Sequence, residues 1–280
     1  MATKVPAFSD IGRATRDLLY GSKSGVFQYN QALNITTRTA DGVEFAVTTI
    51  KKDEKVEAAL KAAYKTKKYG VTGTFGSAGL ATTSVSFYNI APGLDVTLFG
   101  TLPDVASAAK VSADYVVPHL TVKTVVGLTQ NPKIDLQATT GYKDFIFGGE
   151  ATFDTNKQDV TKWSAGVGYQ RLDYAVGALL KDMGNTLTVA YAHNVDASLS
   201  AGAEISKRLN EKEGTSFTLG VQKKLDNGSL VKVRLDNQGI ASGLYETMLK
   251  PMHKLALSGQ FDATNMEKPP KIGFALDIKN

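Results

Sequence analysis

One stretch near the carboxyl end decides the fold: Pro270-Lys271-Ile272-Gly273-Phe274-Ala275-Leu276-Asp277-Ile278-Lys279-Asn280. Its large apolar residues alternate with polar or small ones. Because successive side chains of a strand point to opposite faces, this pattern predicts a strand with one apolar face. A strand at the edge of a sheet presents a row of unpaired backbone groups unless another strand covers it. We therefore expect this strand to close a barrel.

The same alternation repeats through the sequence from residue 26 onward. Clear examples are 43–48, 56–65, 120–128 and 217–221, and the hairpin signals Asp41-Gly42 and Asn227-Gly228 lie between such runs. Roughly 255 residues at about 13 to 14 per strand and turn give on the order of 18 to 20 strands. No break in composition divides the chain, so we predict a single domain over 1–280, with the barrel over 26–280.

The polar face of these strands favours a membrane barrel with a wet lumen. It carries many charges, among them Lys61, Lys110, Lys123, Asp114 and Glu150. A packed, dry interior would make such charges costly. A β-sandwich could show the same alternation and stays open, although sandwiches rarely exceed about ten strands in one domain. In lipid, only a closed sheet satisfies every backbone group.

Composition excludes several classes of function. The chain of 280 residues has no cysteine, which excludes disulfides and thiolate zinc sites. Its histidines, His119, His193 and His253, are widely spaced, so we predict no metal site, no cofactor and no enzymatic activity. The net charge of +5 suits anionic solutes but is too weak for a nucleic-acid partner. No apolar run approaches the ~20 residues of a membrane helix, and no secretory signal peptide is expected.

Residues 1–20 follow a different period from the rest. Apolar or small residues recur at helical spacing, which predicts a short amphipathic helix: Val5, Phe8, Ile11, Thr15, Leu18 and Leu19. Such a helix could pack on a core, lie on a membrane surface or lie inside a lumen. The sequence Gly21-Ser22-Lys23-Ser24-Gly25 follows it, and we interpret 21–25 as a flexible hinge with Gly21 and Gly25 at its ends.

Several motifs resemble one known family. The run from Pro6 to Tyr20, Pro-Ala-Phe-Ser-Asp-Ile-Gly-Arg-Ala-Thr-Arg-Asp-Leu-Leu-Tyr, resembles the N-terminal helix of mitochondrial porins, the voltage-dependent anion channels, most closely their plant and algal members. The runs 115–120 and 138–142 are also similar to that group. The terminal residues Lys271, Gly273, Leu276 and Ile278 resemble the sorting signal of mitochondrial outer-membrane barrels. The similarity extends over essentially the whole chain.

The resemblance implies an all-β transmembrane barrel of about 19 strands. The first and last strands would pair in parallel, the others antiparallel, and the helix would lie in the lumen. It also implies a place in the mitochondrial outer membrane and voltage gating. The residue pattern allows 19 strands but does not choose 19 over 18 or 20.

Two positions depart from the family pattern. Gly93-Leu94-Asp95 stands where family members often have Gly-Leu-Lys, a motif linked to nucleotide contact. Phe75 stands where animal members carry a membrane-facing Glu implicated in hexokinase interaction, so we do not carry that partner over. Phe is the residue expected on a lipid-facing strand surface.

The resulting hypothesis is a weakly anion-selective pore for ATP, ADP, phosphate and chloride. Basic side chains raise the local concentration of anions, and the candidates are Arg13 and Arg16 on the helix with Lys110, Lys123, Lys232, Arg234 and Lys254 on the wall. The expected partners are the lipid bilayer, weakly and transiently bound metabolites and nucleotides, and further copies of the chain. The alternatives are a protein-import pore of the same barrel class, a non-conducting lipid-handling or scaffold barrel, and a soluble ligand-binding β protein.

Overall fold

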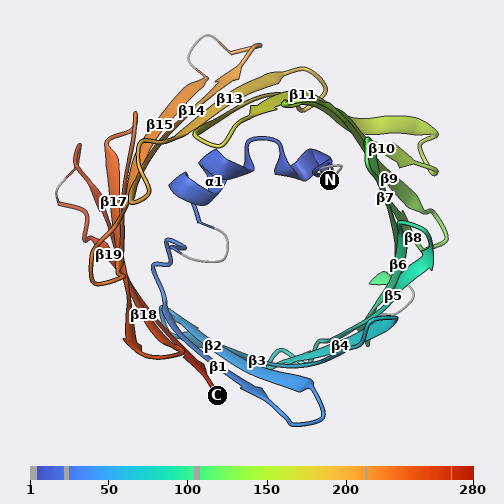
Figure 1. The fold of residues 1–280 in the computed structure, drawn as a ribbon, viewed down its shortest axis with the longest axis horizontal. Coiled ribbons are helices and arrows are strands. Elements are labelled where there is room, and N and C mark those ends of the chain that lie inside the picture. Colours follow the sequence, from blue (N-terminus) through green and yellow to red (C-terminus); the bar gives the residue numbers. More distant parts are fainter. Residues whose placement is uncertain (1–4, 22–24, 104–107, 212–213, 266) are drawn as a thin grey trace.

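The computed structural model describes residues 5–21, 25–103, 108–211, 214–265 and 267–280. It forms a ring of strands that surrounds a short helical segment (Figure 1). Residues 1–4 of the predicted helix and 22–24 of the predicted hinge lie outside the described residues.

Nineteen strands form one sheet, and consecutive strands are neighbours in it. Their bounds are β1 Gln31–Arg38, β2 Val43–Lys52, β3 Lys55–Lys65, β4 Tyr69–Gly76, β5 Ala81–Ala91, β6 Leu94–Leu102, β7 Lys110–Val117, β8 Leu120–Gly127, β9 Lys133–Tyr142, β10 Phe145–Asp154, β11 Asp159–Gln170, β12 Tyr174–Lys181, β13 Thr186–Asn194, β14 Leu199–Arg208, β15 Thr215–Lys224, β16 Leu230–Asp236, β17 Ile240–Lys250, β18 His253–Asp262 and β19 Lys271–Lys279.

The terminal stretch closes the barrel, as its pattern predicted. β19 pairs with β18 in antiparallel fashion and with β1 in parallel, in a register that places Leu276 opposite Leu33 and Ile278 opposite Ile35. The side chain of Asn34 donates a hydrogen bond of 2.6 Å to Asp277 across this parallel seam. Closure into one sheet excludes the sandwich. The count of 19 and the parallel seam confirm what the family resemblance implied.

The outer face of the barrel is apolar. Large hydrophobic side chains remain exposed there, and Phe75 on β4, at 56% exposure, lies opposite Leu60 of β3. Aromatic rings pair near strand ends: Tyr64 and Tyr69 have ring centroids 6.2 Å apart, and Phe145 and Tyr169 lie 4.8 Å apart. Exposed apolar residues over the whole outside, with aromatic residues near the strand ends, are typical of a surface that faces lipid.

The N-terminal segment lies inside the barrel (Figure 1). It consists of a 3-10 turn, η1 Phe8–Asp10, and the α-helix α1 Arg13–Leu19. The continuous helix expected over 1–20 is therefore interrupted. Gly12, between the two pieces, has a φ of 71°, a left-handed conformation that glycine adopts without steric cost and that cannot continue an α-helix.

Candidate functional site

The apolar face of the N-terminal segment packs on the inner wall. Each of the six residues predicted for that face is buried, from Leu18 at 7% exposure to Leu19 at 0%. η1 contacts β9 and β10, and α1 contacts β13, β14 and β15. Phe8 and Ile11 form a buried cluster with Leu179 of β12, against which Ile146 of β10 also packs. The helix is thus held along one side of the lumen.

Glycines of the wall make room for these side chains. A Cβ atom on Gly148 would lie 3.0 Å from Phe8, and one on Gly202 would lie 3.2 Å from Leu18. A Cβ on Gly177 would lie 3.0 Å from the backbone nitrogen of Gly12. We call the inward-facing glycines under the segment the glycine track: Gly141, Gly148, Gly166, Gly168, Gly177, Gly202 and Gly220. Glycine within a strand commonly marks such a close approach.

Two cations of β16 bind the carboxyl end of α1. Lys232, only 2% exposed, donates a 2.7 Å hydrogen bond from Nζ to the carbonyl oxygen of Asp17. Arg234 donates to the carbonyl oxygen of Leu19 at 3.5 Å, and its guanidinium lies 5.2 Å from the ring centroid of Tyr20. The last carbonyls of a helix have no intrahelical partner and carry partial negative charge, so cations there stabilise the docked helix.

Tyr20 continues this contact beyond the helix. Its hydroxyl donates to Glu204 of β14 at 3.0 Å. Partial burial, and then the negative charge of Glu204, raises the pKa of the Tyr20 phenol above its usual range. The phenol therefore stays protonated and keeps donating at neutral pH.

The two arginines of α1 have different surroundings. Arg13 forms ion pairs with Asp10 at 3.1 Å and Asp17 at 3.4 Å, and the charge of Asp10, then that of Asp17, raises the pKa of its guanidinium. Arg16 donates to the carbonyl oxygen of Ser9. Within the described part of the chain, no carboxylate lies at ion-pair distance from Arg16.

The remaining predicted cations lie on the inner wall. Lys123 pairs with Asp114 at 3.7 Å, and Lys254 pairs with both Glu246 and Asp277 at 3.4 Å. Lys110 lies away from the helix and lines a cavity of about 600 Å³ together with hydroxyl groups of β4, β5 and β6. The wall therefore places the predicted basic residues at the lumen, mostly beside carboxylates or the helix.

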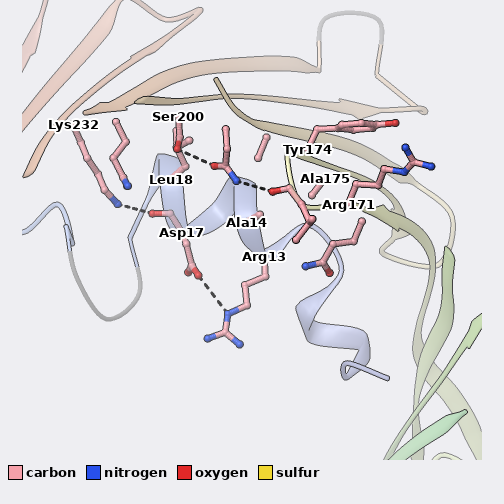
Figure 2. Close-up of a pocket in the computed structure, with 14 residues that line it drawn as sticks. Arg13, Ala14, Asp17, Leu18, Arg171, Tyr174, Ala175, Ser200 and Lys232 are labelled. Carbon is pink, nitrogen blue, oxygen red and sulfur yellow. Dashed lines mark hydrogen bonds and ion pairs between the residues drawn. The ribbon is translucent and has the colours of Figure 1, made fainter. Parts of the chain in front are cut away.

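A second cavity, of about 420 Å³, lies between α1 and the wall (Figure 2). Figure 2 shows Lys232 reaching from the wall to Asp17, and Arg13 directed away from the wall towards the side chain of Asp17. Asn194 and Ser200 hydrogen-bond to each other at 2.9 Å on the wall side. The lining is polar and open, which suits hydrated solutes better than a tightly held ligand.

No cluster of metal-ligating side chains occurs among the described residues. Within that same part of the chain, no helix has both the length and the apolar character needed to cross a membrane.

Comparison with known proteins assigns the family. The model of the eukaryotic porin family matches residues 4–273. The chain belongs to the eukaryotic porin family.

Relatives of this porin support the assignment over the full length. It is 31% identical to mitochondrial outer membrane protein porin 4 of Arabidopsis thaliana, with 100% of both chains covered. It is 32% identical to mitochondrial outer membrane protein porin 5 of Oryza sativa subsp. japonica, again over 100% of both chains. The expected resemblance to plant mitochondrial porins is confirmed.

One solved structure shares the fold of this porin. A mutant of Rh. blastica porin superposes with a TM-score of 0.50 at 10% sequence identity, covering 81% of this chain and 91% of that one. The family and the barrel together make this chain a β-barrel of the mitochondrial outer membrane and a pore for small solutes. The family and the barrel fold point to a channel rather than an enzyme.

The two predicted hinge glycines of this porin lie at crowded positions. Gly21 and Gly25 have φ values of 78° and 64°, in the left-handed region. A Cβ on Gly21 would lie 2.6 Å from the Cα of Val26. The hinge role of Gly21 and Gly25 stays a prediction.

The four residues of the predicted sorting signal all lie on β19. Gly273 faces inward, where the chain segment before β1 crosses it: a Cβ there would overlap the carbonyl oxygen of Gln28 and lie 2.6 Å from the Cα of Tyr29. Gln28 also accepts a hydrogen bond from the hydroxyl of Ser258 on β18. Gly273 thus has a packing role besides its predicted sorting role.

Sequence reasoning missed three kinds of residue in this porin. It did not single out Glu246, which accepts a 2.7 Å hydrogen bond from the backbone nitrogen of Gly25. It did not single out Thr121, which donates to the carbonyl oxygen of Val5 at 2.6 Å. It also overlooked the glycine track, although glycines at polar-face positions of neighbouring strands are visible in the sequence.

Proposed function

We propose that this porin is a voltage-gated, weakly anion-selective diffusion pore for ATP, ADP, phosphate and chloride. The observation that carries the proposal is a closed barrel with a helix in its lumen, lined by polar and charged side chains. The bilayer and the small anions are the proposed partners, the anions binding weakly. A site that conducts must release what it admits.

The excess of basic over acidic residues in the whole chain supports a mild preference for anions. The chain carries 32 basic and 27 acidic residues. Several lumen lysines lie beside carboxylates, including Lys123 and Lys254. Neighbouring charges of opposite sign cancel much of each other's field, so the net excess rather than any single lysine biases ion entry.

The charges of the helix bear on voltage gating. Between residues 5 and 20, Arg13 and Arg16 balance Asp10 and Asp17, which leaves a net charge of zero. Moving one elementary charge through 100 mV is worth about 2.3 kcal/mol. The gating charge therefore has to come from outside residues 5–20, either from Lys4 and Lys23, which flank them in the sequence, or from wall cations such as Lys232 and Arg234.

The test is conductance of the purified, detergent-refolded protein in a planar bilayer, under a salt gradient and a slow voltage ramp. We expect large conductance steps, a reversal potential on the anion side, and closure at both polarities. Folded, β-rich protein without conductance would contradict the pore. A reversal potential on the cation side would contradict the selectivity, and steps that ignore voltage would contradict the gating.

A further inference from the structure

Two residues of the connection between α1 and β1, Gly21 and Gly25, are closely packed. Gly21 approaches Val26, and a Cβ on Gly21 would overlap the carbonyl oxygen of Gly25. The two glycines thus lie against each other, both in left-handed conformations that other residues adopt only at a cost. Gly21 and Gly25 therefore have little space in which to move.

Lys232 holds this connection from the wall. A Cβ on Gly25 would overlap the Cε atom of Lys232 and lie 2.7 Å from its Nζ atom. The same Nζ atom donates to the carbonyl oxygen of Asp17 on α1. Lys232 is therefore enclosed between the helix and the connection, and a buried ammonium group requires such a partner to offset its lost hydration.

Glu246 holds the connection from the neighbouring strand, β17. Its Oε2 atom accepts the 2.7 Å hydrogen bond from Gly25 and lies 3.4 Å from Nζ of Lys254. Lys254 in turn pairs with Asp277, which accepts from Asn34 across the parallel seam. The Glu246 side chain is only 12% exposed, so these contacts lie in a partly desolvated place.

We propose that Lys232 and Glu246 are positioning residues that lock the connection and so fix α1 in the lumen. We call Gly21, Gly25, Lys232 and Glu246 the linker lock. In this arrangement glycine is required at 21 and 25 for close packing, and the helix leaves the wall only when the contacts of Lys232 and Glu246 break. The effect of the lock on conduction rests on the proposed pore function, whereas its effect on the helix does not.

The absence of cysteine allows a direct test. Ala14→Cys places a single thiol on the exposed side of α1, where a nitroxide spin label reports how mobile the helix is. We expect a mainly immobile spectrum for the otherwise unchanged chain in lipid vesicles. Lys232→Met keeps most of the stem but removes the ammonium, and Glu246→Leu removes the acceptor.

Lys232→Met and Glu246→Leu should each raise the mobile fraction of the spin label roughly tenfold, because each removes one charge-assisted hydrogen bond. Glu246→Gln should have a smaller effect, because the amide oxygen still accepts from Gly25 while the charge facing Lys254 is lost. Lys123→Met is the matched control for helix mobility, since Lys123 pairs with Asp114 on β7 rather than with α1. Its spectrum should match that of the parent.

A double-mutant cycle tests the lock from the connection itself, and its first arm, Gly25→Ala in the otherwise unchanged chain, remains informative if Lys232→Met fails to refold. Gly25→Ala should mobilise the label, because its methyl group meets Lys232. In a Lys232→Ala background the added methyl group should have a smaller further effect, because only the left-handed φ of Gly25 and the nearby Leu230 still oppose it. Independent sites do not show such non-additivity.

Recording conductance on the same samples separates the two proposals. Unchanged spectra in Lys232→Met, Glu246→Leu and Gly25→Ala would overturn the lock, whatever the conductance. An immobile spectrum in the parent and mobile spectra in these variants, in a protein that never conducts, would keep the lock and overturn the proposed pore. Equal mobilisation by the Lys123→Met control would also overturn the lock, because it would show a general loosening of the barrel.

Discussion

The two sides of the barrel wall follow the same alternating pattern but use their inward positions differently. On the side from β9 to β16, inward positions carry glycines and two cations, the buried Lys232 and the partly buried Arg234, which receive the helical segment. On the side from β4 to β7, inward positions carry hydroxyls and Lys110, which line an open cavity. The first side therefore specifies where the helix lies, and the second leaves water-filled space for solutes.

The same alternating strand pattern therefore serves both to hold the helix and to line open space. Alternation fixes only which face a residue occupies. The size of the inward residue then decides whether another segment can approach the backbone, and a glycine permits this where even alanine would not.

Gly273→Ala should destabilise the folded barrel more than Gly177→Ala or Gly25→Ala. The added Cβ would overlap the backbone of Gln28, and backbone atoms cannot move aside by a change of rotamer. We expect a loss of about 3 kcal/mol or failure to refold. Denaturant unfolding in detergent, followed by the fluorescence of Trp163, measures this without any import machinery and so separates packing from sorting.

The control for that variant is Gly259→Ala on the neighbouring strand. An added Cβ on Gly259 would have no neighbour within 4 Å among the described residues. The free energy of unfolding should change by less than about 1 kcal/mol in this variant. Equal midpoints for the two variants would contradict the crowded crossing at Gly273.

Gly177→Ala should loosen the helix while the barrel stays intact. The methyl group would press on the backbone of Gly12 at 3.0 to 3.1 Å, at a cost of about 1 to 3 kcal/mol. Gly100→Ala is a control on the open side: Gly100 lies on the outer face of β6 with Leu98 and Leu102, and its methyl group would meet nothing within 4 Å of the described atoms. Spin-label mobility at position 14 should increase in the first variant only, and an equal response in both would contradict the glycine track.

Reversing both helix arginines should weaken the anion preference. Arg13→Glu with Arg16→Glu lowers the lumen charge by four, whereas Lys110→Glu on the open side lowers it by two. Reversal potentials in a salt gradient should therefore shift towards cations in both variants, by more in the double variant. Unchanged reversal potentials in the double variant would count against a role of the helix in selectivity.

Asp114→Asn should have the smallest effect. Its pair with Lys123 is exposed, with side chains 42% and 43% accessible, and exposed ion pairs contribute at most about 1 kcal/mol. The unfolding midpoint should barely move. A large loss of stability would contradict this expectation and show that the open side also contributes strongly to the stability of the barrel.

Much of this architecture was predictable from the sequence. The alternation of Ile272, Phe274, Leu276 and Ile278 predicted a strand, and β19 confirms it. The helical spacing of residues 5–19 identified the six residues that bury against the wall. Both predictions succeeded because local periodicity follows from backbone geometry alone.

The interior of the site was less predictable. Lys232 and Arg234 were predicted at the lumen as attractors of anions, and the structure places them on the carbonyls of α1. Residues 17 and 232 are far apart in sequence, and no local pattern joins them. Their contact depends on the curvature of the closed sheet and on where the helix enters it.

Local sequence was sufficient to predict the period of each segment, the apolar outer face of the strands and the polarity of the lumen. Each of these depends only on the side chain and its neighbours along the chain. The tertiary structure alone decided that α1 lies against β13 to β15, that Gly273 clears a path for Gln28, and that Glu246 holds Gly25. These contacts join segments up to hundreds of residues apart, so they come into existence only when the barrel closes.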